Sequence, residues 1–309
     1  MNKKIAVLLK IFISLGLMTF LISQVDFRQI FSILKNVDII MIFYALIMLI
    51  IQAFVATARW QFVLNCQKIK ISYKNILKIL WSGLFFNQAM PSSVGGDVIR
   101  GYYLKKEGMS LGRATLGVLM DRLFGMMGLV ILVLISLPLL FELVDDTTAQ
   151  TGILFIALSA SIALMIILFT DKLPGNFSHL KLIEGFYSLS KDTRHCIVKN
   201  HCGLIIIPVS ILIHIISVTT VMIIAAGLNL NVDLWGGLLI FPLVSLMLVA
   251  PISIAGWGVR EGAMVVGFGY LGVAPEAALA LSILYGLSAL IVALPGGVVW
   301  ALKRNHGPN

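Results

Sequence analysis

The sequence predicts an all-α polytopic membrane protein with about six full spans and two re-entrant helical hairpins related as an inverted repeat. Three observations support this prediction. Of the 309 residues, 59% are hydrophobic and 12% are charged, whereas soluble chains carry about 25% charged residues. The mean hydropathy is +1.01, and apolar runs of about 17–25 residues, the length of a helical span, recur along the chain. Two shorter runs end in similar motifs that contain Pro and Gly.

Six apolar runs are long enough to cross a bilayer, and two shorter ones belong to the hairpins. The expected spans are 5–23, 37–58, 115–141, 152–170, 204–228 and 277–302. The short runs 76–90 and 238–250 lead into the breaker-rich segments 91–97 and 251–258, and a Gly-spaced apolar piece follows at 262–273. Surface helices are expected around 101–113 and 178–199. The chain is expected to form one domain, 1–309, with repeat units at 76–122 and 238–286.

The basic residues predict the orientation of the chain in the membrane. If both termini are cytoplasmic, 19 of the 23 Lys and Arg residues lie on the cytoplasmic side, whereas the opposite loop 142–146 is acidic. Such a bias is the positive-inside signal. We therefore expect an integral protein of the plasma (inner) membrane with cytoplasmic N- and C-termini. The net charge of +9 sits in short loops without interleaved aromatic residues, so nucleic acid is not an expected partner.

The two hairpin motifs align with a constant offset of 160 residues. The identical pairs are Pro91 and Pro251, Ser93 and Ser253, Gly96 and Gly256, and Arg100 and Arg260. Three full spans separate the motifs, and an odd number of crossings places the two hairpins on opposite faces. Interrupted hydrophobic segments at matching places in two halves indicate a transporter's binding site.

The hairpin chemistry suits a phosphate group. Pro ends each incoming helix, and glycines allow close backbone approach to a ligand. The freed N–H groups would bind an anion at a helix N-terminus, and Arg is suited to bidentate phosphate binding. The residues expected to contact the substrate are Asn87, Ser93, Gly95, Gly96, Asp97, Arg100, Asp121, Arg122, Ser253, Gly256, Arg260 and Glu261.

Several of these residues have a structural alternative. Asp97 either steers a cationic headgroup or neutralises Arg100 one turn away. Asp121 and Arg122 lie inside a span, where ionisable residues are functional by default, or they form a structural pair. Glu261 binds an amine or a proton, or supports its neighbour Arg260. Asn87 is expected mainly to make a hydrogen bond between helices.

No cofactor or metal is expected from the sequence. The pairs His195-Cys196 and His201-Cys202 invite a zinc interpretation, but the helical register places only His195 and Cys202 on one face. The three cysteines, Cys66 included, are expected in reduced, solvated loops of the cytoplasm. His214, inside the span 204–228, is expected to be neutral and bonded to a Ser or Thr of a neighbouring helix.

The sequence resembles the flippase-like transmembrane family, the membrane region of lysylphosphatidylglycerol synthases, as a stand-alone member. The resemblance rests on the segment 87–97 with Arg100, on Asp121-Arg122 followed by Gly125, and on the segment 251–261. It implies movement of an aminoacylated lipid between leaflets, without the synthase domain and so without transferase activity. The resemblance also leads us to expect an Arg after Tyr285, where this chain has Gly286.

These observations predict a lipid flippase that moves a phosphate-bearing headgroup, aminoacylated or glycosylated, of a phospholipid or polyprenyl-linked lipid. A non-transporting membrane partner of a lipid or glycan synthase remains the main alternative. An intramembrane lipid-modifying enzyme is the third interpretation, for which Ser93 and Ser253 are the available nucleophiles. The cargo, direction, energy source and any homo-oligomer are not determined by the sequence.

Overall fold

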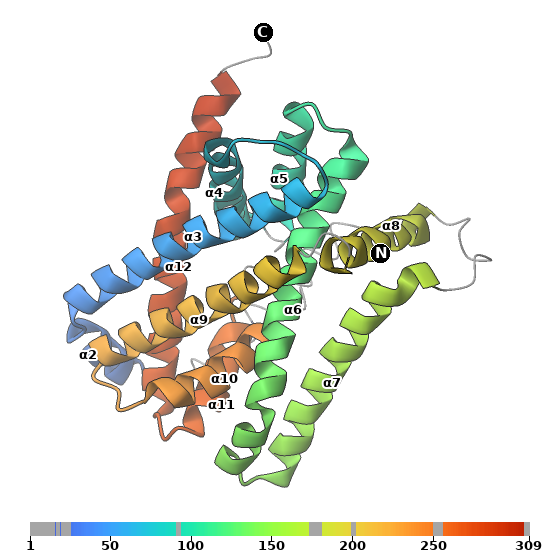
Figure 1. Ribbon diagram of the computed structural model, residues 1–309. Coiled ribbons are helices and arrows are strands. Elements are labelled where there is room, and N and C mark those ends of the chain that lie inside the picture. Colours follow the sequence, from blue (N-terminus) through green and yellow to red (C-terminus); the bar gives the residue numbers. More distant parts are fainter. Residues whose placement is uncertain are drawn as a thin grey trace.

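The computed structural model describes residues 26–90, 94–172, 181–198, 202–249 and 256–305, together with Gly16 and Thr19. Within these ranges every regular element is a helix (Figure 1). The elements are α2 (Phe27–Lys35), α3 (Ile39–Cys66), α4 (Tyr73–Ala89), α5 (Gly95–Lys106), α6 (Leu111–Leu143), α7 (Thr147–Phe169), η1 (Thr170–Lys172), α8 (Lys181–Val198), α9 (Gly203–Gly227), α10 (Leu234–Met247), α11 (Val259–Gly269) and α12 (Pro275–Asn305).

Five of these helices are long and apolar enough to cross a bilayer, namely α3, α6, α7, α9 and α12, and α10 is a shorter apolar helix. They match five of the six expected spans; the sixth, 5–23, lies outside the described residues. Large apolar side chains point outward from the spans, among them Phe155 with 73% of its surface exposed and Leu204 with 75%. Such exposure is unfavourable in water but not in lipid. The prediction of an all-α polytopic membrane protein is confirmed.

The helices begin at polar residues that cap them. The side chains of Asp38, Ser110, Asp146 and Asp233 accept hydrogen bonds from backbone N–H groups in the first turns of α3, α6, α7 and α10. A cap satisfies N–H groups that have no partner inside the helix. This matters in a membrane, where water does not reach unpaired backbone groups.

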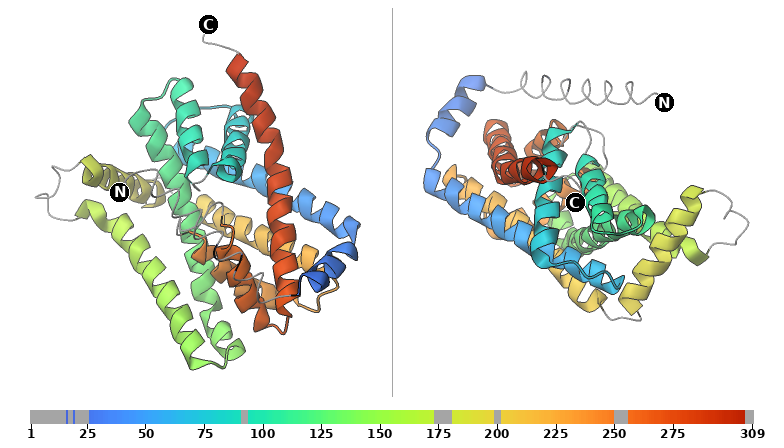
Figure 2. Two further views of the ribbon diagram at one scale, coloured as in Figure 1. Left: turned by 180° about the vertical axis from the view of Figure 1, so that it is seen from behind. Right: turned by 90° about the horizontal axis from the view of Figure 1, so that it is seen from above.

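The helices α3–α6 and α9–α12 form two matching halves. The first residues of the paired helices α3 and α9, α4 and α10, α5 and α11, and α6 and α12 are 164, 161, 164 and 164 positions apart. Their packing also matches. The helix α4 packs on its partner α5 and on α12 of the other half, and α10 likewise packs on its partner α11 and on α6 of the other half. Figure 1 shows α6 and α12 running in opposite directions, and Figure 2 shows the same from behind. The inverted repeat predicted from the motifs is therefore present in the fold.

Each half contains a pair of short helices that pack together. In Figure 1 the pair α4–α5 lies at the end of the molecule where α12 finishes, and the pair α10–α11 lies towards the opposite end. The tips at 91–93 and 250–255, including Ser93 and Ser253, lie outside the described residues. The expected surface helix at 101–113 is wrong, because 95–106 is the second arm of the first pair and 111 begins α6. The helix expected at 178–199 is α8.

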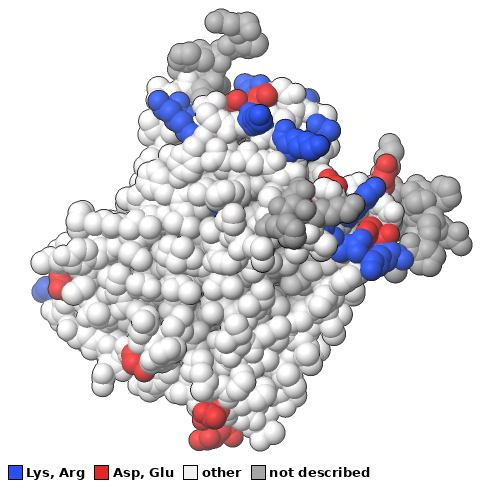
Figure 3. All heavy atoms as spheres, in the orientation of Figure 1, with Lys and Arg blue, Asp and Glu red and all other residues white. Residues whose placement is uncertain are grey.

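Charge divides the molecule into two ends. Figure 3 shows Lys and Arg gathered at the end formed by α4, α5 and the start of α6, and along α8, whereas Asp and Glu are prominent at the opposite end. Among the acidic residues is the loop that joins α6 to α7, which contains Asp145 and Asp146. The polarity predicted from the basic loops is thus reproduced in three dimensions.

Candidate functional site

A cavity of about 310 Å³ lies between α3, α4, α5, α6 and α12. Its polar lining contains residues from all five helices and is rich in guanidinium groups. The polar lining residues are Gln52, Arg59, Asn87, Gln88, Arg100, Asp121, Arg122 and Tyr285. Leucine, alanine and valine side chains complete the wall. The cavity is open at one side, since the side chain of Arg122 retains 49% exposure.

A buried network of charged residues lines part of this cavity. Asp121 of α6 has 2% exposure, and its two carboxylate oxygens accept from Arg59 Nε at 2.9 Å and Arg100 Nη2 at 2.6 Å. A buried carboxylate is costly unless it is paired and hydrogen-bonded. Asp121 therefore holds two guanidinium groups from separate helices, α3 and α5, against α6.

The network continues towards the surface through Asp97. Its carboxylate accepts from Arg122 Nε at 2.9 and 3.1 Å, and from Arg100 Nη1 at 3.4 Å. Of the two interpretations given for Asp97, neutralisation of Arg100 is observed, and Arg122 is a second partner. The three guanidinium groups of Arg59, Arg100 and Arg122 face two carboxylates, which leaves one net positive charge on the network.

Arg100 is held in place but keeps donor capacity. Its guanidinium lies over the Trp60 ring, with Cζ 3.8 Å from the ring centroid, and such stacking fixes the plane of the group. Its buried Nε has no hydrogen-bond partner among the described residues. A buried donor without a partner is unfavourable, so an anion that accepts from this group would be stabilised.

The backbone around the first tip is arranged differently from the expectation. The backbone N–H of Gly96 donates to Asn87 Oδ1 at 2.9 Å, so Asn87 makes the predicted bond between helices. In the second half, the N–H of Gly258 donates to Glu261 Oε2 at 2.6 Å. Two N–H groups at the hairpin helix starts are therefore already satisfied, and the expected backbone nest for phosphate is incomplete. The guanidinium groups are the stronger candidates.

Close packing explains the glycines of the first tip. A Cβ on Gly96 would lie 2.1 Å from the backbone oxygen of Gly83, so only glycine lets α4 and α5 approach this closely. A Cβ on Gly95 would lie 2.5 Å from the sulfur of Met90. At the second tip, Gly256 has a φ of 84°, which favours glycine. These glycines position the hairpins, and no contact with a ligand is needed to explain them.

The arginine of the second motif, Arg260, lies in a separate buried network. Arg260 donates to Glu261 Oε1 from Nη2 at 2.7 Å and to Ser282 Oγ from Nε at 3.1 Å, and Ser282 in turn donates to Glu261. Arg260 also lies over the Trp257 ring, with Cζ 4.7 Å from the centroid. Glu261 is fully buried and both of its oxygens accept bonds from the chain. Arg260 does not line the cavity that contains Arg100.

Tyr285 of α12 lies close to both networks. It lines the cavity, and its ring centroid lies 6.0 Å from Arg260 Cζ. Ser217 of α9 accepts a hydrogen bond from Gln52 of the cavity wall at 2.7 Å. Arg260 is not among the residues that line the cavity, so the expected juxtaposition of Arg100 and Arg260 in one open cavity is not observed.

Gly286 explains the missing arginine after Tyr285. A Cβ at this position would lie 2.2 Å from Nη2 of Arg260. The guanidinium of Arg260 therefore occupies the space that a side chain at 286 would need.

Arg59 and Gln52 line the cavity but are not among the residues predicted from the sequence to contact the substrate. The span expected at 37–58 stops one residue before Arg59, whereas α3 continues to Cys66 and Arg59 is buried within it. The signal was present, since 60–66 continues the apolar character of the span beyond Arg59. His214 bonds the backbone oxygen of Gly125 at 3.0 Å, not the expected Ser or Thr.

Comparison with known proteins agrees with this architecture. A UPF0104 membrane protein of Methanothermobacter thermautotrophicus is 24% identical over 281 residues, covering 81% of this chain and 81% of that protein. A UPF0104 membrane protein of Methanocaldococcus jannaschii is 28% identical over 233 residues, covering 72% of this chain and 96% of that protein. Another from the same organism is 30% identical over 104 residues, about a third of each chain.

The family model described as the lysylphosphatidylglycerol synthase TM region matches residues 7–297, nearly the whole chain. The match includes both helix pairs, the charge network on Asp121 and the network on Glu261. The chain belongs to the lysylphosphatidylglycerol synthase TM region family.

Proposed function

We propose that this protein moves a phosphate-bearing lipid headgroup between membrane leaflets through the cavity between α3, α4, α5, α6 and α12. The single observation that carries the proposal is the cluster of three guanidinium groups in that cavity, with one positive charge in excess. Exposed charge inside a membrane protein is costly and is commonly functional. An anionic headgroup would neutralise the excess and replace its lost water with hydrogen bonds.

The shape of the cavity also supports a lipid rather than a free solute. The charged groups of the lining come from α3, α5 and α6, whereas the apolar side chains of Leu84, Ala289 and Val292 come from α4 and α12. A headgroup can bind the guanidinium groups while its acyl chains stay in lipid beside the apolar side. Water-to-oil transfer of a polar group without partners costs several kcal/mol, so a lined path lowers the barrier to crossing.

Tyr285 is the proposed barrier between the cavity and the second half of the path. It lines the cavity beside residues of the first half, and its ring centroid lies 6.0 Å from Arg260 Cζ of the second half. A rotation of this ring would join the cavity to the Arg260 network. The cavity as observed and its mirror arrangement would then be the two alternating states of the transporter.

Arg122 provides the sharpest test of the proposal. It lines the cavity, but its side chain is half exposed, so Arg122→Gln should fold. Removing one charge-assisted contact worth about 1.5–3 kcal/mol should slow headgroup movement by roughly 10–100-fold. The measurement is the loss of fluorescence of a labelled phosphatidylglycerol in proteoliposomes after a quencher is added outside. Lys105→Gln, an exposed change on α5 away from the cavity lining, is the matched control.

The same assay distinguishes the chemistry of the cargo. A glycosylceramide analogue carries a polar headgroup without phosphate, and we expect it to move no faster than in protein-free vesicles. Equal rates for wild type and Arg122→Gln with every phospholipid would contradict the proposal. That result, together with co-purification of a lipid or glycan synthase, would favour the non-transporting partner role instead.

A further inference from the structure

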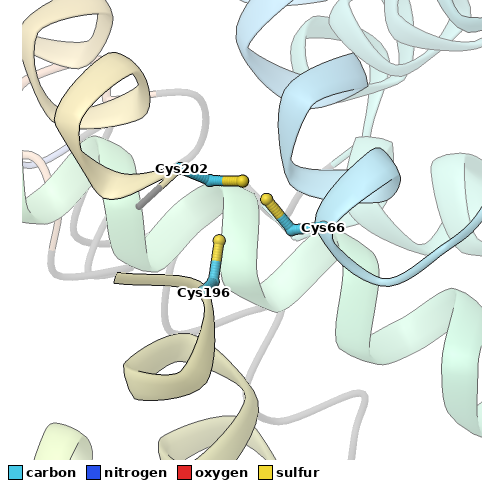
Figure 4. A group of neighbouring side chains, drawn as sticks. All are labelled: Cys66, Cys196 and Cys202. Atoms are coloured by element: carbon cyan, nitrogen blue, oxygen red, sulfur yellow. The ribbon is translucent and has the colours of Figure 1, made fainter. Parts of the chain in front are cut away.

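The three cysteines of the chain lie together at the basic end of the molecule. The Sγ atoms of Cys66, Cys196 and Cys202 all lie within 4.8 Å of one another, and all three thiols are free. Figure 4 shows the side chains pointing toward a common centre from α3, α8 and the start of α9. Cys196 is buried with 1% exposure. The expectation that all three thiols lie in solvated loops is therefore wrong, because Cys66 and Cys196 lie in α3 and α8 and Cys196 is buried.

We propose that Cys66, Cys196 and Cys202 bind a thiophilic divalent cation of the Zn²⁺ type. Zn²⁺ binds thiolates at about 2.3 Å in tetrahedral geometry, which places the sulfur atoms about 3.8 Å apart. The observed separations need to close by no more than about 1 Å to reach that value. Three thiolates are a soft ligand set that selects Zn²⁺ or Cu(I) over hard cations.

Each cysteine is held at a defined point of the backbone. Cys66 is the last residue of α3, and a tight C-terminal turn follows it, in which the N–H of Ile69 bonds Leu64 O at 3.0 Å and Lys68 has a φ of 60°. Cys202 is the N-cap of α9, where the helix dipole favours a thiolate. The ligands are thus preorganised by helix ends, as a specific metal site requires.

The third ligand is positioned by the docking of α8. Ser190 of α8 donates to Asp171 Oδ1 at 2.6 Å, and Arg194 forms an ion pair with the same carboxylate. These contacts fix α8 beside the end of α7 and direct Cys196, two residues after Arg194, inward. The hydroxyl of Thr193, fully buried in α8, has no hydrogen-bond partner among the described residues.

A pocket beside the cluster provides access and a fourth coordination position. It has a volume of about 200 Å³ and is lined by Cys66, Gln67, Lys68, Arg113, Leu116, Met120, Asp192 and His195. A water molecule or the imidazole of His195 would complete the tetrahedron from this side. Three thiolates around Zn²⁺ carry one net negative charge, which Lys68 and Arg113 in the same pocket would offset. The basic end is also the predicted cytoplasmic side, where thiols stay reduced.

The consequence of binding would be a link between the surface helix and the membrane core. α8 is joined to its neighbours through segments 173–180 and 199–201, and its described contacts are with α6, α7, η1 and α9. A metal held by Cys66 would tie α8 directly to the end of α3. This link is independent of the lipid path proposed above, since no cysteine lines that cavity.

Cobalt substitution tests the site without interference from other thiols, because these are the chain's three cysteines. Titration of the purified, reduced, full-length protein with Co²⁺ should give a thiolate-to-cobalt charge-transfer band that saturates at one equivalent and is abolished by Zn²⁺. Each of Cys66→Ser, Cys196→Ser and Cys202→Ser should weaken Co²⁺ binding by at least the roughly 100-fold that loss of a second-shell partner costs. Lys191→Ser, an exposed change on α8, should leave Co²⁺ binding unchanged.

Two results would overturn the proposal. One is the absence of a charge-transfer band in wild-type protein that elutes as a folded species in detergent. The other is a disulfide among these cysteines, found by mass spectrometry in protein isolated from cells under thiol-blocking conditions. Should a Cys→Ser variant fail to fold, the corresponding Cys→Ala variant and zinc analysis of the wild-type protein decide the question. Neither readout depends on lipid movement.

Discussion

At the scale of single residues, the protein buries several ionisable groups and compensates nearly all of their charge locally. Asp121 pairs with Arg59 and Arg100, Asp97 pairs with Arg100 and Arg122, and Glu261 neutralises Arg260. Compensation makes each network rigid, because every partner satisfies lone pairs or donors of another. The exception is the surplus guanidinium in the first network. The two halves therefore differ at the residue level, although their helices match.

Removing the charge of Asp121 tests this interpretation. Asp121→Asn keeps the size of the side chain but leaves buried Arg59 without its carboxylate and Arg100 with only the 3.4 Å contact to Asp97. Breaking a buried pair in this way costs about 3–5 kcal/mol. We expect a clearly lowered midpoint of thermal unfolding in detergent. Asp145→Asn, an exposed acidic residue in the loop between α6 and α7, is the control and should leave the midpoint unchanged. An Asp121→Asn variant as stable as wild type would mean that the network is not coupled to folding.

At the scale of elements, the paired short helices are the distinctive feature of the fold. The arms α4 and α5 approach closely because glycine faces glycine, and the bond from Gly96 to Asn87 closes the tip. α5 in turn carries Arg100 and Asp97 to the cavity. The spacing of α4 and α5 therefore decides whether the guanidinium of Arg100 reaches Asp121.

Gly96→Ala and Gly101→Ala, both on α5, distinguish the effect of close helix packing on stability from the effect of helix propensity. In Gly96→Ala the new Cβ meets the backbone oxygen of Gly83, so the helices must separate, at a cost of about 1–3 kcal/mol by the range found for overpacking. In Gly101→Ala nothing lies within 4 Å of the new Cβ, and alanine is favoured over glycine in a helix by up to about 1 kcal/mol. Thermal unfolding should thus shift down for the first variant and not for the second. Equal shifts in the same direction would contradict the role given to the close approach.

At the scale of the whole molecule, two matched halves of opposite direction pack against each other. The helices α3 and α9 pack together, and α6 and α12 each pack on a short helix of the other half. The buried apolar side chains form two core clusters, one around Trp60 and Phe124 and the other around Met264 and Phe268. The helices α3, α6, α9 and α10 contribute residues to both clusters, so the cores connect the two halves.

Site-directed labelling tests the predicted orientation of the molecule. In a background with the three native cysteines replaced by alanine, Asp145→Cys changes the loop between α6 and α7 at the acidic end, and Lys105→Cys changes the end of α5 at the basic end. Both positions are exposed. A membrane-impermeant maleimide added to intact cells should label the first variant and should reach the second after permeabilisation. The reverse labelling pattern would mean that the molecule has the opposite orientation in the membrane, contrary to the positive-inside rule.

Much of the architecture was predictable from the sequence, because lipid restricts spanning structures to helices of a narrow length range. Apolar run length predicted the five spans that the structure describes, basic loops predicted the orientation that the labelling experiment tests, and the recurring Pro–Ser–Gly–Arg pattern with an odd number of spans between its copies predicted the inverted repeat. The tertiary structure alone decided which polar groups meet. It placed Arg59 against Asp121, kept Arg260 out of the lining of the cavity that contains Arg100, and placed Cys66 beside Cys196 and Cys202. The physical reason is that helix periodicity is local, whereas these contacts join residues 62, 130 and 136 positions apart and depend on how the helices pack.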